Sequence, residues 1–376
     1  MSTITCKAAV CWGPDEPLKI EEIEVEPPRA SEIRVRMICA SLCHTDILCQ
    51  HGFPSPLYPR ILGHEGVGVV ESVGEGVTNI KEGETIIPIF IGECGECLNC
   101  VSGKTNICFK HPLPLDGLMP DGTSRLSVGG QKLFHITSCG TWSEYMVINV
   151  NYAVKVDPSL PPAHASLLSC GFSTGYGGPW KEAKVKEGSS AVIFGLGGVG
   201  IGAIASAKMM GASKIIGVDI NNKKKEKGEL FGMTDFVNPI EAGKSASEAI
   251  KEMTGGLGVD YSFECSGAEN LLNEAVAATI PGRGMTIAIG TGVKQVVSFN
   301  MFELFANRTL RGSLFGGLRA RSDLPIVIQK CLNKEFELDV LVTHKIRLEE
   351  INEALVLMKQ PDCLKIVIQI GVGQEA

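Results

Sequence analysis

The sequence has no excess of basic residues. Its 35 Lys and Arg residues are outnumbered by 42 Asp and Glu residues, which gives a formal net charge of −7. Because a polyanion is bound largely through Lys and Arg, we expect no nucleic-acid partner. Hydrophobic residues make up 44% of the 376-residue chain and charged residues 20%, a composition that excludes a disordered protein, and the length favours two domains.

The sequence also lacks a long apolar run. The longest, residues 191–207 (AVIFGLGGVGIGAIASA), is shorter than the roughly 20 apolar residues that a membrane-spanning helix needs, and glycines interrupt it. We expect it to form a buried strand followed by a buried helix, with no membrane association. The N-terminus shows no apolar segment typical of a signal peptide. These absences predict a cytoplasmic protein, in which clustered cysteines bind metal rather than form disulfides.

The strand pattern changes near residue 172. Before this point the chain reads as short strands and glycine turns, as in residues 32–40 and 82–90. After it, apolar strand candidates recur, and helix-length segments separate the first three, which predicts βαβ units and a parallel sheet. These candidates are residues 190–195, 214–219, 260–267, 285–290 and 309–316. Two amphipathic helices, within 322–336 and 348–360, and a last strand at 363–370 complete the prediction.

Four cysteines lie in one glycine-rich loop. Cys94, Cys97, Cys100 and Cys108 are spaced C-x2-C-x2-C-x7-C. Two residues between cysteines allow one turn to wrap a metal ion, and four thiolates complete a tetrahedral zinc shell without an open position. An iron–sulfur cluster is one alternative, but the bacterial ferredoxin run continues with a different spacing. Unliganded reduced thiols are the other, and structural zinc is favoured over both.

A dinucleotide fingerprint follows the first strand of the second region. Gly195, Gly197 and Gly200 form G-x-G-x-x-G between a strand-like and a helix-like segment, and the next strand ends at Asp219. The glycines would allow a tight turn, close approach of the pyrophosphate and close helix packing. Asp219 is placed to bind both ribose hydroxyls and to repel a 2′-phosphate, which favours NAD over NADP. Its simplest alternative is an exposed loop carboxylate.

Further metal-capable residues are scattered over three segments: SLCHTD (41–46), GHEGVG (63–68) and LLSCGFSTGYG (167–177). Their spacing alone does not join them, because lone Cys and His residues are more often packing residues. At these segments, however, the chain resembles the zinc-containing medium-chain alcohol dehydrogenases, and most closely their plant branch. Together with the four-cysteine loop, GLGGVG and GVDIN, the resemblance covers nearly the whole chain.

The resemblance implies an α/β fold in two domains. A Rossmann-type doubly wound parallel sheet would occupy residues 172–315, and a GroES-like β-rich catalytic domain residues 1–171 and 316–376. Two zinc ions per chain are implied. Cys43, His64 and Cys170 would bind the catalytic ion, with an open fourth position, and the four-cysteine loop the structural one.

The same resemblance assigns further roles. Asp46 would orient the zinc-binding histidine, Glu65 would lie close behind the metal, and Thr45 would bind the alcohol oxygen and pass on its proton. Phe90 and Trp142 would line the substrate pocket. Contacts with the cofactor are implied for His44, Thr174, Val199, Lys224 and Lys365. Leu48 departs from the pattern, since many relatives end the proton relay with histidine there.

The predicted function is therefore reversible, zinc-dependent hydride transfer between NAD and a hydrophobic primary, allylic or aromatic alcohol. One alternative is a lyase on the same scaffold, such as a cyanohydrin-cleaving enzyme that keeps NAD bound without using it. A non-enzymatic binding protein is the other, although all three catalytic ligands are present. The expected partners are a small alcohol or aldehyde and a second copy of the chain, because residues 309–317 resemble the edge strand of the family's dimers.

Overall fold

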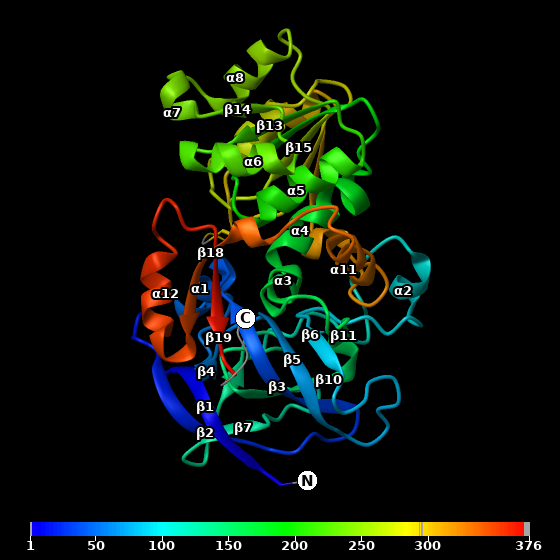
Figure 1. The fold of residues 1–376 in the computed structure, drawn as a ribbon. Helices are drawn as coiled ribbons and strands as arrows, with labels where there is room; N and C mark the ends of the chain where they lie inside the picture. The colour runs from blue at the N-terminus through cyan, green and yellow to red at the C-terminus, as the bar shows by residue number, and fades with distance from the viewer. Residues whose placement is uncertain (1, 293, 295, 372–376) are drawn as a thin grey trace. The chain divides into compact units, whose positions relative to one another are not determined.

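The computed structural model describes residues 2–292, 294 and 296–371 and contains two compact units (Figure 1). The first domain comprises residues 1–170 and 319–376, and the second domain residues 171–318. The expected boundaries, after residues 171 and 315, lie close to these positions. The second segment of the first domain returns after the second domain and adds two helices and two strands to it.

The second domain is built on a six-stranded, fully parallel sheet. Its strand order, β14-β13-β12-β15-β16-β17, reverses at β12, as in Rossmann folds, where ligands bind at the carboxyl ends of the strands beside the reversal. The strands are β12 (Ser190–Phe194), β13 (Lys214–Val218), β14 (Asp235–Val237), β15 (Tyr261–Glu264), β16 (Met285–Ala288) and β17 (Thr309–Gly312).

Helices pack against both faces of this sheet. Successive side chains of β12 point to opposite faces, so each face presents apolar residues to a helix layer. Val192 and Phe194 join a buried cluster with residues of α8 and α9. Ile193, between them, faces α5, since its Cγ2 would lie 3.3 Å from a Cβ on Gly200. The segment 191–207 thus forms the strand and the buried helix expected from its sequence. The helices are α4 (Gly171–Gly177), α5 (Gly198–Met209), α6 (Lys225–Phe231), α7 (Pro239–Ala242), α8 (Ala246–Met253), α9 (Leu271–Ala277) and α10 (Met301–Phe305).

The first domain is β-rich and contains two mixed sheets. One has the order β8-β7-β2-β1-β4-β9; in the other, β11-β6-β5-β3-β19-β18, β3 also pairs with β10. The strands of the first sheet are β1 (Ile4–Cys11), β2 (Lys19–Val25), β4 (Arg60–Ile61), β7 (Leu126–Val128), β8 (Gln131–Lys132) and β9 (Phe134–His135). Those of the second are β3 (Glu32–Ser41), β5 (Glu65–Val73), β6 (Thr85–Pro88), β10 (Tyr145–Asn149), β11 (Ala153–Lys155), β18 (Val342–Arg347) and β19 (Lys365–Gln369).

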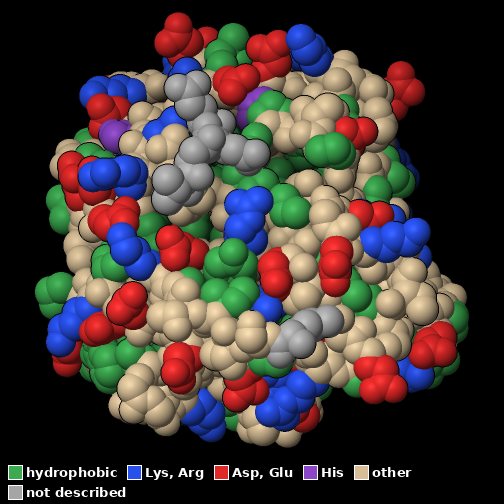
Figure 2. Space-filling view, turned by 60° about the horizontal axis from the view of Figure 1, so that its bottom comes forward, with side chains coloured by type: hydrophobic (Ala, Val, Ile, Leu, Met, Phe, Trp, Pro, Cys, Tyr) green, Lys and Arg blue, Asp and Glu red, His purple; other side chains and the backbone are tan. Residues whose placement is uncertain are grey.

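Strand β19, predicted from residues 363–370, pairs with β3 and so brings residues 367–369 beside residues 39–41. Short helices supplement the sheets: α1 (His44–Gln50), α2 (Leu98–Ser102), α3 (Pro162–Leu168), α11 (Leu324–Leu332) and α12 (Ile351–Leu357). The first three of these helices were not predicted. Among the described residues, no helix has the length and apolarity to cross a membrane. On the face seen in Figure 2, basic and acidic side chains are interspersed rather than separated by sign.

Candidate metal and nucleotide sites

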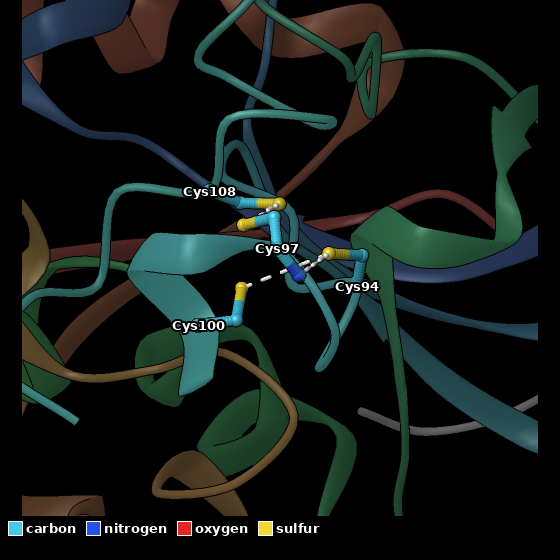
Figure 3. Close-up of side chains that lie close together, drawn as sticks. All are labelled: Cys94, Cys97, Cys100 and Cys108. Atoms are coloured by element: carbon cyan, nitrogen blue, oxygen red, sulfur yellow. Dashed lines mark hydrogen bonds between the residues drawn. The ribbon is translucent and has the colours of Figure 1, made fainter. Parts of the chain in front are cut away.

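The four cysteines of the glycine-rich loop converge (Figure 3). Their sulfur atoms all lie within 4.8 Å of one another, with 3.8 Å between Cys94 and Cys100 and 3.9 Å between Cys97 and Cys108. These separations are far above a disulfide bond length of about 2 Å, and all four thiols are free. Four thiols at the corners of so small a volume fit a tetrahedral zinc ion.

Local backbone geometry gathers these thiols. Helix α2 begins after Cys97, and Gly103, with a φ of 64°, ends it. Amide groups of the turn donate to sulfur, as from Cys97 N to Cys94 Sγ at 3.3 Å. A backbone hydrogen bond from Cys100 lowers the pKa of Cys97 to about 6, whereas burial raises the pKa of the Cys100 thiol to about 12, so Cys97 loses its proton before Cys100 does.

A second cluster joins residues from three distant segments of the first domain. One ligand atom each of Cys43, His64, Glu65 and Cys170 lies within 4.8 Å of the others. Cys43 immediately precedes α1, His64 precedes β5, and Cys170 follows α3. His64 Nε2 is 3.3 Å from Cys170 Sγ. Two thiols and an imidazole are the donor set that zinc binds in catalytic sites with an open position.

Asp46 fixes the orientation of this imidazole. Its Oδ1 lies 2.7 Å from His64 Nδ1, and its Oδ2 accepts a hydrogen bond of 3.0 Å from the amide of Cys43. One carboxylate therefore fixes the segments of two candidate ligands, Cys43 and His64, and it leaves Nε2 directed at the thiols. Burial favours the neutral imidazole, but the charges of Asp46, Cys170 and Cys43 outweigh this effect and raise the pKa of His64.

Glu65 and Lys365 form a buried ion pair beside the cluster. The Lys365 ammonium contacts Glu65 Oε2 and donates to the Leu42 carbonyl at 3.0 Å, and Ser41 Oγ donates to the same carboxylate at 2.5 Å. Burial lowers the pKa of Lys365, but the Glu65 charge overcomes this and raises it. The predicted cofactor contact of Lys365 stays a prediction, because the structure gives its ammonium partners within the first domain. The role of Ser41 had no signal in the sequence.

The predicted proton path lies on α1. Thr45 is half-buried and His44 exposed, so both can meet a ligand, whereas Leu48 is only 3% exposed. Beyond the helix, His51 Nδ1 contacts the exposed carboxylate of Asp15. Leu48 thus places a buried hydrocarbon at the position where the resemblance predicts the end of the proton relay.

The two aromatic residues predicted for the substrate pocket differ in surroundings. The Phe90 ring meets the His64 ring edge to face, with the centroids 5.6 Å apart. Trp142 is fully buried in the hydrophobic core of the first domain, and its Nε1 has no hydrogen-bond partner among the described residues. A cavity of about 500 Å³ opens elsewhere in this domain, beneath residues 110–122, and no predicted site residue lines it.

In the second domain, the fingerprint forms the expected strand–turn–helix. Gly195 has a φ of +87°, and a Cβ on Gly200 would lie 1.9 Å from the Gly195 carbonyl oxygen, so neither position accepts a side chain without strain. Gly197 caps the N-terminus of α5 in an extended conformation, and Val199 lies in the first turn. The free amides of such a helix end favour a phosphate.

Asp219 lies directly after β13, next to this turn. Its Oδ2 accepts a hydrogen bond of 2.8 Å from the Leu196 amide and lies 3.0 Å from Lys224 Nζ, while Oδ1 accepts from Asn221. The carboxylate is therefore fixed, and it is not the exposed loop group considered as an alternative, since the residue is 8% exposed. Thr174, on α4, is buried, and its hydroxyl has no hydrogen-bond partner in the described part of the chain.

Comparisons with known proteins agree with this arrangement. The family model described as alcohol dehydrogenase GroES-like domain matches residues 29–158, and that of zinc-binding dehydrogenase matches residues 198–333. Alcohol dehydrogenase 1 of Tanacetum cinerariifolium is 55% identical over 98% of both chains. The "CYP enzymes assisting alcohol dehydrogenase" of Catharanthus roseus is 54% identical over 98% of this chain and 100% of its own.

Solved structures show the same similarity. An alcohol dehydrogenase zinc-binding domain protein from Burkholderia ambifaria has a TM-score of 0.90 at 32% identity, over 98% of this chain and 100% of its own. Benzyl alcohol dehydrogenase from Acinetobacter calcoaceticus has a TM-score of 0.88 at 27% identity, again over 98% and 100% of the two chains.

Proposed function

The chain belongs to the zinc-containing medium-chain alcohol dehydrogenases, and from this premise we propose that it exchanges a hydride between NAD and a hydrophobic primary alcohol, allylic or aromatic in kind. The protein is a zinc-dependent alcohol oxidoreductase. We propose NAD as the cofactor, a hydrophobic alcohol as the substrate, and the residue roles given below. The observation that carries it is the convergence of Cys43, His64 and Cys170, with Asp46 holding the imidazole.

The donor chemistry of both clusters fits zinc. We assign Cys43, His64 and Cys170 to the catalytic ion, and the four-cysteine loop to a structural ion that its four thiolates would enclose completely. A zinc ion in the first cluster supplies Lewis acidity, which eases loss of the alcohol proton and polarises a carbonyl in the reverse direction. Asp46 would keep His64 in the tautomer whose Nε2 binds metal.

Residues of the first domain would bind the substrate and accept its proton. The Thr45 hydroxyl, half-buried on the first turn of α1, would accept a hydrogen bond from the alcohol and pass its proton outward. The Phe90 ring, which packs against His64, would exclude water beside the ligands and favour an apolar substrate. The predicted contact of Trp142 with substrate requires a movement of neighbouring side chains, because the residue is fully buried.

The second domain would bind the dinucleotide, which supplies the hydride acceptor. Amides at the start of α5, near Val199, would bind the pyrophosphate, and Asp219 would bind the adenosine ribose and repel a 2′-phosphate. Further cofactor contacts are proposed for His44, Thr174, Lys224 and Lys365.

A homodimer and a cytoplasmic location complete the proposal. Strand β17 lies at the edge of the parallel sheet, so its outer backbone groups are available for pairing with a second copy. On α10, Phe302 and Phe305 are 79% and 72% exposed, which adds apolar surface that an interface would cover. A zinc site of four thiolates fits a reducing compartment.

The test follows the ultraviolet absorbance of NADH with a panel of primary, allylic and aromatic alcohols, with NADP in parallel. We expect turnover with NAD, faster for the hydrophobic alcohols, and two zinc ions per chain by elemental analysis. Carbonyl release from a cyanohydrin without any NADH signal would favour the lyase alternative. Preference for NADP would overturn the role of Asp219, and light scattering after size-exclusion chromatography would test the dimer.

A further inference from the structure

The side chain of Thr141 occupies the space that side chains on Gly63 and Gly66 would need. A Cβ on Gly63 would lie 2.4 Å from Thr141 Oγ1 and equally close to Trp142 Cδ1. A Cβ on Gly66 would lie 3.1 Å from Thr141 Cγ2 and 2.8 Å from Met37 Cε, so Thr141 shares this second space with Met37. These glycines flank His64 and Glu65 in the GHEG segment, and Thr141 itself is fully buried. The hydroxyl of one threonine thus rests against the first glycine and its methyl group against the second.

Hydrogen bonds fix the same segment. The Thr141 amide donates to the Gly63 carbonyl at 2.9 Å, and the Thr141 hydroxyl donates to the Glu65 carbonyl at 2.9 Å. The Trp142 amide adds a bond of 3.1 Å to the Leu62 carbonyl. The backbone is therefore fixed on both sides of His64.

The next amide connects this segment with another proposed ligand. Gly66 N donates to Ser169 Oγ at 3.2 Å, and Ser169 Oγ donates to the Ser166 carbonyl at 2.5 Å. Ser169 is fully buried and precedes Cys170. A continuous set of short contacts thus links Thr141, the GHEG segment and the Cys170 segment.

We propose that Thr141 is a positioning residue for the catalytic metal site: its wedged side chain and its hydroxyl fix residues 63–66 so that His64 Nε2 faces the thiols before metal binds. A preformed site binds its ion more tightly, because less conformational freedom is lost on binding. If Thr141 only filled space in the core, valine, which has nearly the same shape, would serve equally well. The inference rests on the ligand set proposed above.

The test compares Thr141→Val, which replaces the hydroxyl with a methyl group, with Thr141→Ser, which keeps the hydroxyl. The catalytic-site zinc affinity is measured by competition with a chelator, and the site geometry by the ligand-field absorption of the cobalt-substituted protein. We expect a loss of affinity of roughly 10- to 100-fold and shifted cobalt bands for T141V, as for partners of metal ligands. T141S, which keeps the hydroxyl but loses the methyl group beside Gly66, should lose clearly less affinity than T141V. The structural zinc should be unaffected in both.

Thr279→Val is the matched control. Thr279 is also fully buried, and its hydroxyl donates to the Val276 carbonyl at 2.8 Å, but it lies in the second domain. This variant should lose stability without any change at the metal sites. If T141V fails to fold, Thr141→Ala is compared with Thr141→Ser instead, because alanine and serine differ only in the hydroxyl.

Unchanged zinc affinity and cobalt bands in the variants without the hydroxyl would overturn the positioning role. A wild-type protein with zinc only in the four-cysteine loop would instead overturn the ligand set itself. Zinc counting therefore separates the two failures.

Discussion

The Asp46 carboxylate lies 2.7 Å from His64 Nδ1, and both side chains are buried. A carboxylate in this position makes Nδ1 the protonated nitrogen and leaves the lone pair of Nε2 for a metal. The same residue accepts a hydrogen bond from the Cys43 amide, so one side chain controls two of the three proposed catalytic ligands.

Replacing Asp46 with Asn should therefore weaken the catalytic site while the four-cysteine site stays intact. We expect zinc affinity at the first site, and with it kcat/KM, to fall roughly 10- to 100-fold, because the amide carries no charge to hold the imidazole N–H. Chelator competition and initial rates measure both quantities. Asp15→Asn is the control, since this exposed carboxylate pairs with His51 outside the cluster. Full zinc affinity in D46N would contradict the orienting role.

Lys365→Met tests the ion pair with Glu65. Both side chains are buried, so removal of the ammonium leaves a carboxylate without its countercharge, and we expect a loss of about 3–5 kcal/mol in the free energy of unfolding. Lys155→Met is the control: its pair with Glu84, at 3.1 Å, is exposed and should contribute about 0–1 kcal/mol. Denaturant titration measures both. A raised KM for NAD with unchanged stability would instead support the cofactor contact.

Cys108→Ser tests the structural zinc. A serine hydroxyl is a poor zinc ligand beside three thiolates, so we expect zinc content to fall from two ions to one per chain. Because this ion would connect both ends of the loop, the half-life at elevated temperature should also fall. Cys363→Ser, outside both clusters, should keep both ions. Retention of two ions in C108S would contradict the assignment.

The sequence predicted best what depends on neighbouring residues. The spacing of Cys94, Cys97 and Cys100 leads directly to the observed cluster, since short loops bring such thiols together. The turn from β12 into α5 was likewise predicted, because the G-x-G-x-x-G spacing is typical of a strand, a tight turn and a helix in succession. Both features are local.

Features that arise from tertiary contacts were not readable from the residues themselves. Only the resemblance joined Cys43, His64 and Cys170, because nothing in their spacing brings three distant segments together. Helix α1 was missed, since a cysteine rather than one of the usual polar caps precedes it. Nothing in the sequence around Thr141 indicates its contacts with residues 63–66. The three-residue strand β14 is too short for a periodic signal.

Proton release is the step for which the family resemblance assigns no terminal base in this chain. Leu48 is buried and cannot carry a proton, and His51, the next histidine, contacts exposed Asp15 at the surface. A route from Thr45 through the cofactor ribose to water or to exposed His44 needs neither residue.

His51→Gln should therefore leave the dependence of kcat on pH unchanged, because the imidazole would take no part in the route. The measurement is kcat over the range from about pH 5 to 9, which spans the ordinary titration of histidine. Leu48→His is the positive comparison: a histidine at this position should add an inflection below the ordinary histidine pKa of about 6.5, because burial disfavours the charged imidazole. Loss of the lower inflection in H51Q would mean that His51 does accept the proton, and the route through the ribose would then have to be abandoned.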